Sequence, residues 1–464
     1  MNHPPANWVL PTAGPHGEPV LDVLVVGAGM CGQTAAYALQ REGVANIRVV
    51  DAGARGDEGP WGTYARMPTL RSPKHLTGPD LGIPSLTFRA WFEAQHGARG
   101  WDALHKVGRI DWRDYLLWVR DTVGLAVENG VRLSSLEDAG NFTRATLQPA
   151  GGATETVLAR KVVLALGRDG SGGPRWPRFP SLVQDAPATR GRIFHSADAI
   201  DFASLAGRRV GVLGAGASAF DNAGTALEAG AQVVLFARRP ILPQVNKSKW
   251  TAFTGFLRGF EALDDARKWR FYTYVFDEQV PPPWESVRRC DDHPAFDLRL
   301  GEGWRDVRID GDHVVVDTVK GTERFDAVIF GTGFDVDLVE RPELAAFALF
   351  IDRWSRHVSP EQATANADAA RFPYLGSGFE LRSVDPAQQP ALSRLHLFNW
   401  GATMSHGALA GDIPGLAIGA TRLAQAIARD LFVADADRHW ERHQAHEEAE
   451  LLFTKRYVAP ENRR

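Results

Sequence analysis

The stretch VLDVLVVGAGMCGQTAAYALQREGVANIRVVD, residues 20–51, decides the fold of this chain. Its apolar run over residues 20–26 ends in glycines and predicts a buried parallel strand. Residues 34–43 have a helical pattern that stops at Gly43, and residues 47–51 form a second apolar strand. A strand, a tight turn, a helix and a second strand in this order begin a doubly wound α/β sheet.

The turn between the first strand and the helix has the pattern GxGxxG. In this pattern Gly27 permits the sharp turn, Gly29 leaves room for a pyrophosphate, and Gly32 lets the helix pack on the strand. The helix N-terminus offers free N–H groups to the phosphates. Asp51 ends the second strand, where its carboxylate can accept hydrogen bonds from ribose hydroxyls. The predicted contacts to this dinucleotide are Gly27, Gly29, Met30, Cys31, Gly32 and Asp51.

The same pattern returns over residues 208–239, RRVGVLGAGASAFDNAGTALEAGAQVVLFARR. Its turn has the GxGxxA form, and the predicted contacts are Gly214, Gly216, Ala217, Ser218 and Ala219. The strand that follows ends in Arg238 and Arg239 where the first unit has an acid. Guanidinium groups there suit a 2′-phosphate, so this second site favours NADPH over NADH.

Two dinucleotide sites in one chain indicate one cofactor that stays bound and one that binds and dissociates in each turnover. A resident flavin would convert hydride chemistry into one-electron or oxygen chemistry. The predicted fold class is therefore α/β, with two Rossmann-like domains and the NADPH domain inserted into the FAD domain. The predicted domains are an FAD-binding part over residues 1–187, an NADPH-binding domain over 188–324 with a partly irregular insertion at about 240–300, and a return to the FAD domain with C-terminal helices over 325–464.

Bulk composition narrows the function classes. The chain has 464 residues, a formal net charge of −4 and two cysteines, Cys31 and Cys290. We therefore expect neither nucleic-acid nor membrane partners, and no CxxC pair is present for dithiol chemistry. No secretory signal precedes the first strand, so we expect a cytoplasmic protein. We assign no metal site, and homo-oligomerisation is possible.

Three motifs resemble a known family. Residues 191–223, GRIFHSADAIDFASLAGRRVGVLGAGASAFDNA, contain Gly191 and His195 before the second glycine turn; VVLALG precedes a proline-rich crossing; and DAVIFGTGFD, residues 326–335, contains Thr332 and Gly333. Together with the two turns, they resemble the flavin-containing and N-hydroxylating monooxygenases, which are relatives of the Baeyer–Villiger monooxygenases. The resemblance implies FAD and NADPH as cofactors, contacts from Thr332 and Gly333, and a single chain that holds both.

The segment PWGTYARMPTLRSPKHLTG, residues 60–78, resembles the part of N-hydroxylating members that surrounds the flavin ring. The resemblance implies that Trp61 contacts the cofactor and that Lys74 contacts the carboxylate of an amino-acid substrate, with His75 where an acid is usual before Leu76. In an alternative alignment, Arg71 takes the place of an active-site asparagine of the flavin-containing group. Solvated basic residues on a loop are the competing interpretation. The surrounding residues, 55–120, show little periodicity and are interpreted as an irregular insertion that ends in a helix from Asp111.

Near the C-terminus, FNWGATMSHGALAGDIPGLAIG, residues 398–419, leads into a helix pattern from Gly415 to Leu431. In flavoproteins a comparable helix directs its N-terminus at the flavin ring, and a nearby acid, here Asp412, binds the ribityl chain. Asn399, Trp400 and His406 would then lie near the ring. A capped terminal helix without a ligand is the alternative.

The activity implied by the resemblance is NADPH-dependent reduction of FAD and transfer of one oxygen atom of O2 to a small molecule. Amine N-hydroxylation or S-oxidation is preferred, with Baeyer–Villiger oxidation as a further possibility. The candidate catalytic residues are Arg71, Lys74, His75 and Asn399. The main alternative is an NADPH oxidase or flavin reductase that transfers no oxygen to a substrate.

Overall fold

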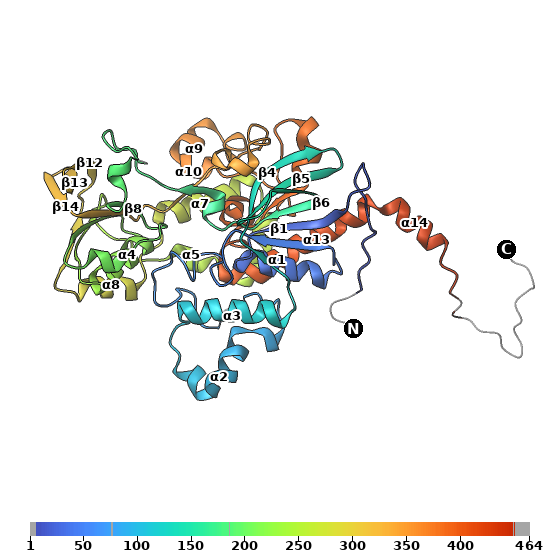
Figure 1. Ribbon diagram of the computed structural model, residues 1–464, viewed down its shortest axis with the longest axis horizontal. Helices are drawn as coiled ribbons and strands as arrows, with labels where there is room; N and C mark the ends of the chain where they lie inside the picture. The colour runs from blue at the N-terminus through green and yellow to red at the C-terminus, as the bar shows by residue number, and fades with distance from the viewer. Residues whose placement is uncertain (1–5, 76–77, 185, 449, 451–464) are drawn as a thin grey trace, which may run out of the picture.

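The computed structural model describes residues 6–75, 78–184, 186–448 and 450, arranged as two neighbouring sheet domains (Figure 1). The first domain is built on a sheet with the order β3-β2-β1-β6-β5-β4, in which β17 also pairs with β6. Its strands are β1 (Val20–Val26), β2 (Ile47–Asp51), β3 (Glu128–Asn129), β4 (Val131–Ala139), β5 (Phe142–Pro149), β6 (Glu155–Leu164) and β17 (Leu395–Leu397). The centre of this sheet is parallel, and Val23, Leu24 and Val25 of β1 have no exposed surface.

Helices α1 (Met30–Arg41) and α13 (Leu416–Ala434) pack together beside this sheet. On α13, Ala420, Leu423 and Ile427 recur at helical spacing and are fully buried. Gly419 lies on the same helix, where an added Cβ would stand 2.4 Å from the carbonyl oxygen of Leu409. A small residue at position 419 therefore lets the chain before α13 pack closely on it, and the predicted helix over 415–431 is confirmed.

The second domain contains a fully parallel sheet with the order β11-β10-β9-β15-β8. Its strands are β8 (Ile193–His195), β9 (Arg209–Leu213), β10 (Gln232–Ala237), β11 (Phe296–Leu300) and β15 (Ala327–Phe330). Helix α4 (Ala217–Glu228) packs on β9 and β10. A separate antiparallel sheet consists of β12 (Trp304–Asp310), β13 (His313–Thr318) and β14 (Thr322–Phe325). The predicted α/β fold with two Rossmann-like units is confirmed.

The chain crosses between the domains twice, through a two-stranded ribbon of β7 (Gly172–Pro174) and β16 (Phe334–Val336). Because β15 still belongs to the second sheet, we place the return crossing at β16 and not directly after residue 324. The proposed boundary therefore moves towards the C-terminus. The first crossing lies before β8, within the proline-rich stretch that the sequence indicates.

The two segments expected to be irregular contain more helix than predicted. Residues 55–120 hold α2 (Phe88–Ala103), bent at Gly97, as well as the expected helix α3 (Arg109–Thr122). The segment 240–300 holds four further helices, α5 (Lys247–Trp250), α6 (Thr254–Gly259), α7 (Asp265–Glu278) and α8 (Trp284–Asp291). The predicted irregularity is wrong here. Several of these helices are short, with four residues in α5 and six in α6, and helical periodicity is hard to recognise over so few residues.

The remaining helices are short and lie mainly in the C-terminal third of the chain. They are α9 (Pro360–Ala365), α10 (Ala367–Ala370), α11 (Gln389–Leu392), α12 (Thr403–His406) and α14 (Ala436–Gln444). Helix α14 projects from the body of the molecule (Figure 1). Within the described part of the chain, no helix combines the length and apolarity that a membrane crossing requires.

Candidate cofactor and substrate site

The first glycine turn forms an open cradle between β1 and α1. Gly27 has a φ of +93°, and a Cβ there would stand 2.5 Å from the carbonyl oxygen of Ala165. At Gly29 an added Cβ would meet nothing closer than the backbone of Gly59, at 3.7 Å. Helix α1 has no side-chain cap and no acid in its first turn. Free N–H groups beside open space suit a bound pyrophosphate.

Asp51 closes this cradle at the end of β2. Its carboxylate accepts hydrogen bonds from the backbone N–H groups of Ala28 and Gly53, each at 2.7 Å. Burial raises the pKa of Asp51, and these two hydrogen bonds oppose the increase. Asp51 therefore supports the glycine turn directly, and its unused lone pairs are available to ribose hydroxyls.

A buried ion pair next to the cradle was not predicted from the sequence. Glu58 and Arg120 are 2.7 Å apart, with side chains that are 6% and 7% exposed. The Glu58 carboxylate also accepts hydrogen bonds from Asn129 and from the N–H of Gly56. This network holds the loop that carries Gly59 against Gly29. No spacing or motif signals it, because Glu58 lies 62 residues from Arg120 and 71 residues from Asn129 along the chain.

The second cradle repeats the first between β9 and α4. Gly214 has a φ of +133°, and its Cβ would lie 2.4 Å from the carbonyl oxygen of Gly331. No atom of the surrounding protein lies within 4 Å of a Cβ at Gly216, and α4 has no side-chain cap. Ala219 is fully buried against Gly331, which explains why alanine is tolerated at the third position of this turn. Ala217 and Ser218 form the first turn of α4 and are only partly buried.

Arg238 and Arg239 follow β10 directly, at the same sheet edge as this second cradle. Arg238 is exposed and Arg239 is half-buried. Among the residues that the structure describes, neither guanidinium has a hydrogen-bond or ion-pair partner. Two unpaired cations at this edge fit the 2′-phosphate of NADPH.

The loop before α13 brings a carboxylate to the first cradle. Gly411 lies beside the Cys31 thiol of α1, and a Cβ on Gly411 would stand 3.3 Å from the backbone nitrogen of Trp400. The next residue, Asp412, is half-buried, and its carboxylate has no hydrogen-bond partner in the described part of the chain. Burial raises the pKa of Asp412, and the charges of Arg168 and Arg71 oppose that increase. An unpartnered acid at this position fits the hydroxyl groups of a ribityl chain.

Asn399 is fully buried next to these residues. Its side-chain oxygen accepts hydrogen bonds from Ser171 Oγ at 3.0 Å and from the N–H of Gly401 at 2.9 Å. Its amide nitrogen has no hydrogen-bond partner among the residues that the structure describes. His406 is also fully buried, with Nε2 bonded to the carbonyl of Gly376 and its ring stacked on Phe379, so it lies within the core.

The three basic candidates of the insertion occupy different positions. Arg71 is exposed and donates to the carbonyl oxygen of Pro281 at 3.0 Å. Lys74 donates to the carbonyl oxygen of Trp101 at 2.5 Å, and its ammonium lies 4.7 Å from the centre of the Trp101 ring. His75 is exposed and contacts the edge of the same ring. Lys74 is therefore engaged by its own segment, and Leu76 lies outside the described residues.

Trp61 lies at the start of the same insertion, half-buried against the edge of Trp112. Its indole nitrogen is buried, and no described residue forms a hydrogen bond with it. An unpaired donor of this kind beside the first cradle is available to a bound cofactor.

Thr332 and Gly333 lie at the return crossing, next to the first crossing. The Thr332 hydroxyl and the carbonyl of Gly333 both contact the backbone of Arg175. His195 Nε2 also lies 3.0 Å from the carbonyl oxygen of Gly333, and its Nδ1 accepts from the N–H of Ala197. Burial lowers the pKa of His195, so a neutral ring joins the two crossings and has a structural role.

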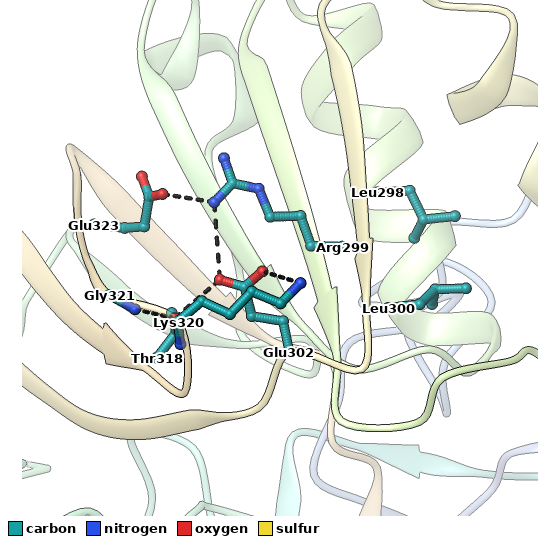
Figure 2. Close-up of a pocket in the computed structure, with 8 residues that line it drawn as sticks. All are labelled: Leu298, Arg299, Leu300, Glu302, Thr318, Lys320, Gly321 and Glu323. Carbon is teal, nitrogen blue, oxygen red and sulfur yellow. Dashed lines mark hydrogen bonds and ion pairs between the residues drawn. The ribbon is translucent and has the colours of Figure 1, made fainter.

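A recess of about 410 Å³ lies elsewhere, between β11 and the hairpin of β13 and β14 (Figure 2). Its charged side chains face one another: Arg299 pairs with Glu323 at 2.5 Å, and Lys320 pairs with Glu302 at 3.3 Å. Thr318 also donates to Glu302. Because these groups satisfy one another, the recess shows none of the unpaired polar atoms that mark the two cradles.

Comparison with known proteins agrees with this architecture. Residues 21–254 match the pyridine nucleotide-disulphide oxidoreductase family. The chain is also 43% identical over 446 residues to the FAD-dependent urate hydroxylase of Xanthomonas campestris pv. campestris. The alignment covers 96% of this chain and 93% of the relative. This chain belongs to the pyridine nucleotide-disulphide oxidoreductase family. Within that family it is an NAD(P)-dependent flavoprotein monooxygenase, the enzyme class that the sequence predicts.

Solved structures show the same fold at low sequence identity. Ornithine hydroxylase from Pseudomonas aeruginosa matches with a TM-score of 0.69 and 17% identity, covering 89% of this chain and all of that one. L-lysine 6-monooxygenase from Pseudomonas syringae matches with a TM-score of 0.67 and 16% identity, covering 88% of this chain and 99% of the other. The disulphide chemistry in the family name has no counterpart here, because Cys31 and Cys290 are free, buried and located in different cores.

Proposed function

We propose that this enzyme hydroxylates urate or a closely related anionic purine, with FAD in the first cradle and NADPH in the second. The overall reaction converts substrate, O2, NADPH and a proton into hydroxylated substrate, NADP⁺ and water. The bound flavin supplies the redox chemistry that connects hydride to oxygen. A cytoplasmic location is part of the proposal, since two buried free thiols fit a reducing compartment.

The observation that carries this proposal is the full-length match to a urate hydroxylase. The aligned region covers 96% of this chain at 43% identity. It therefore includes both cradles, the insertion and the loop before α13. The N-hydroxylating enzymes share the fold at 16–17% identity, and this likeness supports the architecture without a substrate. Urate is a planar purine that is negatively charged at neutral pH, and the exposed guanidinium groups of Arg71 and Arg168 lie close enough to Asp412 to lower its pKa.

The proposed site residues have two roles: most bind the cofactors, and Trp61 shields the reaction from water. Gly29 and Gly216 leave space for two pyrophosphates, while Arg238 and Arg239 bind the 2′-phosphate. Asp412 accepts hydrogen bonds from the ribityl chain. Trp61, on the insertion, limits the access of water to the flavin, which favours oxygen transfer over release of peroxide.

A panel of substrates tests the proposal. NADPH consumption, hydrogen peroxide release and substrate loss are followed together with urate, xanthine, ornithine, lysine, a thioether and a cyclic ketone. We expect urate to stimulate NADPH oxidation, with loss of urate equal to NADPH consumed and little peroxide. Coupled turnover of ornithine or lysine alone would instead assign amine N-hydroxylation. Coupled turnover of the thioether or ketone alone would assign S-oxidation or Baeyer–Villiger oxidation. Peroxide equal to NADPH for every compound would indicate an oxidase.

A further inference from the structure

Arg168 is an exposed cation near Asp412 that has no role in either cradle. It follows β6 at the carboxyl edge of the first sheet, and its guanidinium carbon lies 4.0 Å from the centre of the Trp400 ring. In the described part of the chain, this guanidinium has no hydrogen-bond or ion-pair partner. Its N–H groups are therefore available to a ligand, and the aromatic ring holds one face of the group.

The position of this pair is fixed by a buried network beneath it. Ser171 Oγ lies 3.0 Å from Asn399 Oδ1 and 3.0 Å from the backbone nitrogen of Gly401. Ser171 and Asn399 are both fully buried. The network ties the loop that carries Arg168 to the loop that carries Trp400. The pair is thus preorganised, which reduces the entropy lost when a ligand binds.

The same pair lies beside Asp412, the acid that we propose binds the ribityl chain. The backbone of Trp400 packs against Gly411, and Asp412 follows directly. The unpaired cations suited to the 2′-phosphate, Arg238 and Arg239, belong to the second cradle instead. A flat guanidinium with free N–H groups near Asp412 matches a flat anion, since it can donate two parallel hydrogen bonds to adjacent O and N atoms.

We propose that Arg168, stacked on Trp400, recognises the negative charge of the substrate ring and selects anionic over neutral purines. This inference rests on the proposed function. Arg71 differs because it already donates to the carbonyl of Pro281. Trp400 acts as a positioning residue through Arg168. Because the charge of Arg168 also lowers the pKa of Asp412, the FAD content of each variant is measured alongside ligand affinity.

Ligand binding to the oxidised holoenzyme tests this assignment, with the change in flavin absorbance as the signal. The ligands are urate and tetramethyluric acid, a neutral analogue. Arg168→Gln is expected to weaken urate binding by roughly 10–100-fold, the effect of losing hydrogen bonds to a charged group, and to leave the analogue within about twofold. Arg168→Lys restores part of the affinity. Trp400→Leu has a smaller effect in the same direction. Arg132→Gln, an exposed substitution on β4, is the control and changes nothing.

Three readouts separate the possible outcomes. Retained FAD content and an unchanged KM for NADPH in Arg168→Gln show that the cofactor sites are intact. Unchanged urate affinity in this variant overturns the assignment, and so does a raised KM for NADPH with unchanged urate affinity, since Arg168 would then bind a cofactor phosphate. If the wild type binds urate with the expected dependence on Arg168 but never turns it over, the proposed function fails and the charge-recognition site stands. If the wild type does not favour the anion over its neutral analogue, the inference itself fails.

Discussion

Gly32 packs directly on the backbone of Gly27, so that a Cβ atom at position 32 would stand 1.6 Å from the carbonyl oxygen of Gly27. At Gly29, in the same turn, an added Cβ would make only ordinary contacts with the protein, the nearest at 3.7 Å. The glycines of one motif are thus required for different reasons. Packing within the protein requires glycine at position 32, whereas we propose that a bound pyrophosphate requires it at position 29.

Substitution of these two glycines separates folding from cofactor binding. Gly29→Ala is expected to fold with a normal circular dichroism spectrum and to lose most of its bound FAD, because the new methyl group occupies the space of the pyrophosphate. Gly32→Ala is expected to fail to fold, at a cost above about 4 kcal/mol, the range of exceptionally damaging substitutions. A Gly29→Ala protein that purifies with full FAD would show that the cradle is not used.

We propose that Arg238 sets the preference for NADPH over NADH. Arg238→Ala is expected to raise the KM for NADPH by roughly 10–100-fold, the effect of losing charge-assisted hydrogen bonds to a phosphate, and to change the KM for NADH by less than about threefold. Steady-state rates with both cofactors check this. Arg288→Ala, on exposed α8, serves as the matched control. An equal change for both cofactors would remove Arg238 from the 2′-phosphate site.

The cysteines are expected to be dispensable for turnover. Burial raises the pKa of both the Cys31 and the Cys290 thiols to about 12, so neither is a thiolate at neutral pH. The double variant Cys31→Ala/Cys290→Ala should keep its substrate-stimulated NADPH oxidation within about threefold of the wild type, since neither substitution removes a reactive group. Loss of NADPH oxidation with normal FAD content would reinstate thiol chemistry.

Asp22 makes the stability of the protein depend on pH. Burial raises its pKa to about 6, although Arg160 lies 3.7 Å away. Because the folded state holds this proton more tightly than the unfolded state does, the contribution of Asp22 to stability is complete below about pH 4 and is lost as the pH rises through about 6.

Asp22→Asn removes this dependence. The urea midpoint of the variant should exceed that of the wild type at pH 7.5 and approach it at pH 4.5. The gain at neutral pH should not exceed about 3 kcal/mol, from about 1.4 kcal/mol per unit of pKa. Asp312→Asn, at an exposed surface pair, is the control. A difference between variant and wild type that does not change with pH would contradict the assignment.

Local patterns predict the cradles because each glycine turn lies within one continuous strand–helix–strand segment. The first two strands match their predicted bounds, and Asp51 ends the second of them as expected. The GxGxxG spacing also encodes a steric requirement, which the contact of Gly32 with Gly27 now explains.

The rest of the site depends on contacts between distant segments. Arg168 meets Trp400 only because β6 and β17 are neighbours in the first sheet. Glu58 pairs with Arg120 through the fold of the insertion, without a local signature. Lys74 belongs to the segment that resembles the flavin-surrounding part of N-hydroxylating enzymes. Its ammonium nevertheless donates a hydrogen bond to the carbonyl of Trp101, a contact that no sequence spacing predicts.

Oxygen labelling tests the central claim most directly. The holoenzyme is supplied with NADPH, urate and ¹⁸O2, and the product is analysed by mass spectrometry immediately after turnover. The account predicts that one labelled oxygen atom enters the product for each NADPH consumed. Product that carries only oxygen from water, or labelled hydrogen peroxide equal to the NADPH consumed with urate left intact, would contradict it.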